Sequence, residues 1–121
     1  MSVVCVIDDD QLVRKGLANL LKSEGYEVVC FNSGLTFLSS SLKMRADCLL
    51  MDVSMPQLSG PETCRQLKAE GYDLPVIYMS AHATVPEITP FLKENTVQFI
   101  AKPFKAEVLL TAIIKALKDR P

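Results

Sequence analysis

The chain has 121 residues, of which 49% are hydrophobic and 22% charged, and its formal net charge at pH 7 is -1. This length fits one globular domain, and a chain so close to neutral has no broad electrostatic attraction for nucleic acid or anionic lipid. No apolar stretch approaches the length of a membrane span and the first residues lack the basic start of a signal peptide, so we expect a cytoplasmic domain that contacts neither membrane nor nucleic acid.

Five short apolar runs punctuate the chain, and each has the length of a β-strand. The first, third and fourth are almost continuously apolar, which is typical of strands that are buried on both faces of a sheet. The runs are Val3–Ile7, Glu27–Cys30, Cys48–Met51, Pro75–Met79 and Gln98–Ala101.

Helical periodicity separates these runs. One predicted helix begins near Val13 and stops at Gly25, and a second covers about 60–70 and stops at Gly71. Weaker patterns predict helices at about 33–40 and 86–94, and a final helix covers about 106–118. Strands that alternate with helices predict a parallel sheet with helices on both faces.

A proline and a basic pair stand inside two of the predicted helices. Pro90 falls inside the predicted helix 86–94, where a proline removes a hydrogen bond, so we expect that helix to be short or irregular. Arg14 and Lys15 form the densest basic pair of the first helix, and we expect them on a solvated helix face rather than at a DNA contact.

Polar groups stand at the carboxyl end of four of the apolar runs: Asp8 and Asp9, Asp52, Ser80 and Lys102. The carboxyl ends of parallel strands share one edge, and ligands bind in the crevice there. Three acids, a hydroxyl and an ammonium would therefore converge, as in a phosphoryl-transfer site that uses a divalent metal.

Each of these residues also has an ordinary interpretation. The run Asp8–Asp10 could cap the first helix, and for Asp10 we expect only that role. Taken alone, Asp52 would be a turn residue, Ser80 a loop hydroxyl and Lys102 a solvated amine. Their joint occurrence at one sheet edge favours the site.

The four cysteines stand at positions 5, 30, 48 and 64, without a Cys-x-x-Cys motif and with His82 as the single histidine. This spacing argues against a zinc site. We expect four reduced, structural cysteines, with Cys5, Cys30 and Cys48 behaving as small buried hydrophobes, and redox sensing as the alternative.

Four motifs occur in order along the whole chain: Ile7-Asp8-Asp9-Asp10, the stretch from Met51 to Gly60, Met79-Ser80-Ala81, and the stretch from Phe99 to Phe104. Together they resemble the receiver domain of bacterial two-component response regulators. The stretch from Ala81 to Pro86, together with Phe99 and Lys102-Pro103-Phe104, most resembles the FixJ-type transcriptional regulators. The resemblance implies an α/β, flavodoxin-like (βα)5 doubly wound parallel sheet of strand order 2-1-3-4-5, formed by residues 1–121 as one receiver domain.

The resemblance also implies the chemistry of the site. Asp52 would be the phosphoacceptor, a carboxylate nucleophile that forms an acyl phosphate. Asp9 and Asp52 would ligate Mg²⁺ directly, Asp8 mostly through water, and Ser54 through its main-chain carbonyl, and we expect Mn²⁺ to substitute. Such a domain is not a separate enzyme, because it catalyses only its own phosphorylation and dephosphorylation.

Further roles follow from the same resemblance. Lys102 would pair with a phosphoryl oxygen and Ser80 would donate to another. Ser80 and Phe99 would form the switch, with a permanently buried core phenylalanine as the alternative for Phe99. His82 is expected to be a loop residue beside the site, with modulation of dephosphorylation as its alternative role.

The implied partner is a sensor histidine kinase, and phosphorylation is expected to produce a homodimer contact or release an output module. FixJ-type proteins favour a DNA-binding output domain outside this chain, and a stand-alone phosphorelay receiver is the alternative. Two other interpretations are a pseudo-receiver, which the complete acid set disfavours, and a haloacid-dehalogenase-type phosphohydrolase. Such phosphohydrolases typically carry a second Asp two residues after the nucleophile, where this chain has Ser54.

Overall fold

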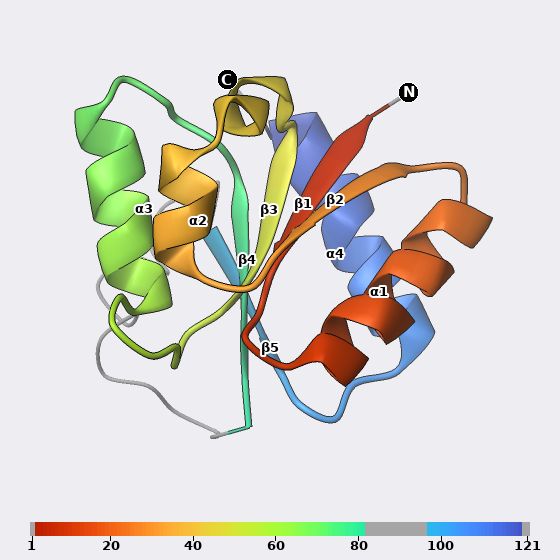
Figure 1. The fold of residues 1–121 in the computed structure, drawn as a ribbon. Helices are drawn as coiled ribbons and strands as arrows, with labels where there is room; N and C mark the ends of the chain where they lie inside the picture. The colour runs from red at the N-terminus through yellow and green to blue at the C-terminus, as the bar shows by residue number, and fades with distance from the viewer. Residues whose placement is uncertain (1, 82–96, 120–121) are drawn as a thin grey trace.

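The computed structural model describes residues 2–81 and 97–119, and these form a five-stranded parallel sheet with helices on both faces (Figure 1). The strand order is β2-β1-β3-β4-β5, which confirms the predicted flavodoxin-like topology. The strands are β1 (Val3–Ile7), β2 (Glu27–Phe31), β3 (Cys48–Asp52), β4 (Val76–Ser80) and β5 (Val97–Ala101).

Helices α2 and α3 cover one face of the sheet and helices α1 and α4 cover the other (Figure 1). Their bounds are α1 (Gln11–Ser23), α2 (Gly34–Ser39), α3 (Gly60–Ala69) and α4 (Ala106–Asp119), and a 3-10 helix η1 (Ser41–Arg45) follows α2. The predicted helix 86–94, with Pro90, lies outside the described residues.

The ends of α1 and α3 follow from local side-chain and backbone chemistry. Asp10 is the N-cap of α1, and its carboxylate accepts hydrogen bonds from the amides of Leu12 and Val13, so its predicted capping role is confirmed. Beyond the two helices, Gly25 and Gly71 have φ angles of +90° and +96°, a left-handed conformation that glycine adopts without strain. The two turns therefore fix where the chain leaves each helix, before β2 in one case and before the segment that leads to β4 in the other.

Side chains that alternate along the central strands fill two cores, one on each face of the sheet. On β1, Cys5 and Ile7 pack toward Phe37 of α2 and Leu67 of α3. Their neighbours on the same strand pack with α1 and α4 on the opposite face. Complete burial of one such aliphatic side chain contributes about 1.5–3 kcal/mol. The carboxyl ends of β1 and β3, which carry the acids, are therefore firmly placed.

The four cysteines are free, but the burial of one of them differs from the prediction. Cys5 and Cys48 are buried, and burial raises the pKa of each thiol to about 12. Cys30 is exposed, so its predicted burial is wrong. It lies near the end of β2, which is an edge strand and is less completely covered than β1 and β3.

Candidate functional site

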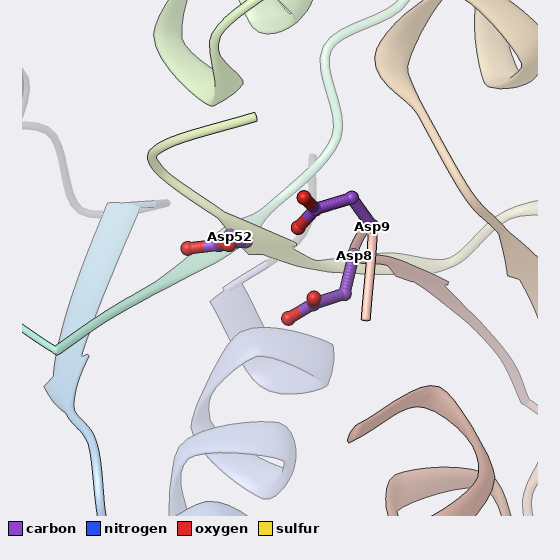
Figure 2. Close-up of side chains that lie close together, drawn as sticks. All are labelled: Asp8, Asp9 and Asp52. Carbon is purple, nitrogen blue, oxygen red and sulfur yellow. The ribbon is translucent and has the colours of Figure 1, made fainter. Parts of the chain in front are cut away.

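The three acids predicted to converge do so at the carboxyl ends of β1 and β3. Asp8 and Asp9 directly follow β1, Asp52 is the last residue of β3, and these two strands are neighbours in the sheet. One carboxylate oxygen from each acid lies within 4.8 Å of the other two. Figure 2 shows the three carboxylates pointing toward the same side from the two strand ends.

The fourth predicted group, Lys102, follows β5 and reaches two of the acids, Asp8 and Asp52. Its Nζ lies 3.0 Å from Oδ2 of Asp8 and 3.9 Å from Oδ2 of Asp52. The main-chain N–H of Lys102 donates to the carbonyl of Ser80, at 2.7 Å, which ties the start of the β5–α4 connection to the end of β4. Residues 94 positions apart, Asp8 and Lys102, therefore form one ion pair.

Asp8 is the most constrained of the acids, because protein groups hold both of its carboxylate oxygens. The amide of Asp10 donates to Oδ1 at 2.9 Å, and Lys102 pairs with Oδ2. The Asp8 side chain is 1% exposed, that of Asp52 is 14% exposed, and Asp9 is exposed. Asp9 is thus the acid most open to a ligand arriving from solvent.

Burial, together with the neighbouring acids, disfavours ionisation of Asp52. Burial is the largest influence and raises the pKa of its carboxyl, the Lys102 ammonium lowers it, and the charges of Asp8 and Asp9 raise it further. A hydrogen bond from the Ser54 amide also lowers the pKa of Asp52. Three hard oxygen donors this close repel one another, so the donor set fits a divalent cation such as Mg²⁺.

The loop after Asp52 is folded tightly against the strand end. The amide of Gly60 donates to the carbonyl of Val53 at 2.9 Å, and a Cβ added to Gly60 would lie 2.6 Å from the Asp52 carbonyl. Gln57, in the same loop, has a left-handed φ of 69°. Ser54 is exposed beside the acids. A residue without a side chain at position 60 therefore lets α3 begin directly at the site.

The two predicted switch residues lie on neighbouring strands. Ser80 is the last residue of β4 and is 2% exposed. Phe99 on β5 is half-buried, and it is paired in register with Tyr78, two residues before Ser80. Phe99 is thus not a fully enclosed core residue. His82 lies outside the described residues.

Sequence reasoning missed one residue near the acids, Arg14. Its guanidinium Nη1 donates to the main-chain carbonyl of Asp8 at 2.6 Å, and the residue is half-buried. The prediction of a solvated face is therefore correct for Lys15, which is exposed, and wrong for Arg14. Spacing alone gives no signal for this contact, because a long side chain that turns back to a main-chain carbonyl leaves no periodic pattern.

A separate hollow of about 380 Å³ lies at the other end of the strands. It is lined mainly by apolar residues, among them Leu67, Tyr72, Val76 and Val97, and the last two are the first residues of β4 and β5. It lacks the carboxylate cluster and is not the site of the predicted chemistry.

Within the described residues, no helix is both long and apolar enough to span a membrane.

Comparisons with known proteins show which proteins this chain resembles. The family model for the response regulator receiver domain matches residues 4–114. The response regulator protein TodT of Pseudomonas putida is 41% identical over 120 residues, which cover 99% of this chain and 53% of TodT. The chain thus spans about half the length of the curated relatives it matches.

Two solved structures show the same fold. The response regulator StyR superimposes with a TM-score of 0.88 at 38% identity, covering 97% of this chain and 59% of StyR. The crystal structure of FixJ-N gives a TM-score of 0.87 at 33% identity, covering 98% of this chain and 95% of FixJ-N. The resemblance indicated by the four sequence motifs is confirmed.

Proposed function

The chain belongs to the response regulator receiver domain family, and from this premise we propose that it is a phosphoacceptor that a sensor histidine kinase phosphorylates on Asp52. The observation that carries the proposal is the cluster at one sheet edge. There the carboxylate of Asp52 lies close to two further acids and 3.9 Å from the Lys102 ammonium. A haloacid-dehalogenase-type activity has less support, because Ser54 offers no carboxylate where such enzymes have their acid.

The acids would hold Mg²⁺, or Mn²⁺ in its place. Asp9 and Asp52 would be direct ligands, Asp8 would act mostly through water, and the Ser54 main-chain carbonyl would add a further oxygen. The assignment to Asp8 is supported by its two existing partners, the Asp10 amide and Lys102. When bound, the ion supplies positive charge between two groups that otherwise repel, the carboxylate and the phosphoryl dianion.

The chain's own residues then account for the transfer. A carboxylate oxygen of Asp52 forms a bond to phosphorus while the bond from phosphorus to the donor's imidazole nitrogen breaks. The electron pair of the broken bond stays on the imidazole, and Asp52 becomes a mixed acyl phosphate. Lys102 is close enough to Asp52 to pair with one of the new oxygens, and Ser80 would donate to another.

We further propose that residues 1–121 act as one receiver unit that controls a DNA-binding output domain in a longer regulator. Two findings support this: the chain spans about half of TodT, and FixJ-N and StyR are among the proteins it resembles.

Incubation with acetyl phosphate and Mg²⁺ tests the assignment of Asp52. Intact-mass analysis should show one added phosphate that is labile to base. The Asp52→Asn variant should show none, whereas Asp73→Asn, an exposed acid before β4, should be phosphorylated normally. Undiminished labelling of the Asp52→Asn variant would overturn the assignment.

A further inference from the structure

Arg14 connects helix α1 to the peptide that carries the acids. It lies one turn after the N-cap Asp10, and its own amide donates to the Asp10 carbonyl at 3.0 Å. From that fixed base, the guanidinium reaches back to the Asp8 carbonyl at 2.6 Å. The neighbouring Lys15 has the same charge but is exposed.

The carbonyl that Arg14 contacts belongs to the peptide unit between Asp8 and Asp9. A peptide unit is planar, so a donor that fixes its oxygen also fixes the direction of the following N–H and Cα. The orientation of the Asp8 side chain does not depend on this contact, because the Asp10 amide and Lys102 hold the carboxylate. Asp9 is exposed, and the direction of its carboxylate therefore depends on how its backbone is held.

We propose that Arg14 is a positioning residue, which orients the Asp8–Asp9 peptide so that the Asp9 carboxylate faces Asp52. The inference rests on the proposed function, because it concerns the metal that Asp9 and Asp52 would share. The role assigned to Arg14 acts through the main-chain carbonyl of Asp8 and not through direct contact with the metal.

Charge and position predict opposite effects, which makes the inference testable. A cation near the acids repels a divalent ion, so if Arg14 acted by charge alone, its removal would strengthen Mg²⁺ binding. If Arg14 acts by position, its removal weakens Mg²⁺ binding. Partners that orient metal ligands typically contribute 10- to 100-fold to metal affinity, and for this more remote contact we expect about 10-fold.

The experiment is a calorimetric Mg²⁺ titration of the whole, unphosphorylated chain. Arg14→Gln removes the charge and leaves a side chain too short to reach the carbonyl, and Lys15→Gln makes the same charge change at an exposed neighbour. We expect Arg14→Gln to bind Mg²⁺ about 10-fold more weakly and Lys15→Gln to bind as the unaltered protein does. Arg14→Lys, which keeps a long donor, should restore most of the affinity.

Urea unfolding with a chelator present shows whether the variants are folded. If Arg14→Gln is not folded, Arg14→Met replaces it, because the methionine keeps the packing of the arginine stem. Two results would overturn this inference alone. One is that the variant at position 14 binds Mg²⁺ as tightly as the unaltered protein or more tightly, and the other is that Lys15→Gln loses as much Mg²⁺ affinity as that variant. Absence of Mg²⁺ binding by the unaltered protein would overturn the proposed function and this inference with it.

Discussion

Two neighbouring aspartates, Asp8 and Asp9, stand in different surroundings. Asp8 is buried and its carboxylate is held by an amide and by Lys102, whereas Asp9 is exposed. We predict that Asp9→Asn lowers Mg²⁺ affinity more than Asp8→Asn does, by about 10-fold, because a direct ligand contributes more than one that acts through water. Titrations of both variants measure this difference. Equal losses, or a larger loss in Asp8→Asn, would refute the assigned coordination.

Asp52 gives a prediction about pH. In the metal-free folded protein, burial is the main cause that raises the pKa of the Asp52 carboxyl. The folded state therefore keeps this proton to a higher pH than the unfolded chain does. Its contribution to stability is therefore lost as pH rises from the ordinary aspartate pKa of 3.8 to the higher folded value. Above that window the Asp52 charge is destabilising. Asp52→Asn should increase the free energy of unfolding at pH 7, in chelator.

The gain from Asp52→Asn should shrink as the pH falls below 3.8, where Asp52 is protonated in both states. Urea unfolding at pH 7 and at pH 3 measures this, with Asp73→Asn as an exposed control. A lower stability of Asp52→Asn at pH 7 would mean that the attraction of Lys102 outweighs burial.

At the scale of elements, the junction of β3 with α3 places Asp52. A Cβ on Gly60 would lie 2.6 Å from the Asp52 carbonyl oxygen. That oxygen is a backbone atom, so it can give way only if the end of β3 moves with it. Gly60→Ala should therefore cost about 1–3 kcal/mol of stability, the usual range for overpacking, and should also slow phosphorylation by acetyl phosphate.

Gly34→Ala is the matched control for that junction. Its added Cβ would lie 2.0 Å from Oγ1 of Thr63, at the contact between α2 and α3, and touches no acid. We expect a comparable loss of stability with nearly normal phosphorylation at temperatures where both variants are folded. If phosphorylation slows equally in both variants, the junction has no special role in placing Asp52.

The same scale shows what sequence can predict. All five strands were predicted from short apolar runs, which are almost continuous in the buried strands β1, β3 and β4 and are interrupted by polar residues in the edge strands β2 and β5. The ends of these runs correctly indicated that the acids and Lys102 meet at one edge. The 3-10 helix η1 was missed, because its apolar residues Leu42 and Met44 are exposed and show no helical periodicity. Cys30 was misjudged because the coverage of an edge strand depends on tertiary neighbours, and Arg14 because its contact with the Asp8 carbonyl leaves no periodic pattern in the sequence.

At the scale of the whole molecule, we predict that the acyl phosphate changes one face of the domain. Ser80 would move toward the new oxygens, and Phe99, which is half-buried on the adjacent strand, would enter the space that this vacates. The changed face would comprise the segment 86–94, β5 and α4, and would support a homodimer or release an output module. Only an interaction that differs in free energy between the two states of this face can shift their balance, and hydrogen bonds to the phosphate would be such an interaction.

Beryllofluoride with Mg²⁺ mimics the acyl phosphate and tests this switch. We expect amide exchange over residues 81–104 to change and sedimentation to show association, and neither effect in Asp52→Asn. Unchanged exchange together with an unchanged sedimentation coefficient would exclude the switch while leaving the phosphorylation site intact.

The ion pair between Asp8 and Lys102 has a consequence for folding. It joins residues 94 positions apart, and the three strand pairings that lie between them in the sheet, β1 with β3, β3 with β4 and β4 with β5, are parallel and so require crossover connections. Such non-local contacts form late and slowly. A chain whose last strand has not docked therefore has acids but no matching lysine. If Asp52 accepts phosphate with the help of Lys102, as proposed, only a completely folded chain would be phosphorylated, and a misfolded chain would give no signal.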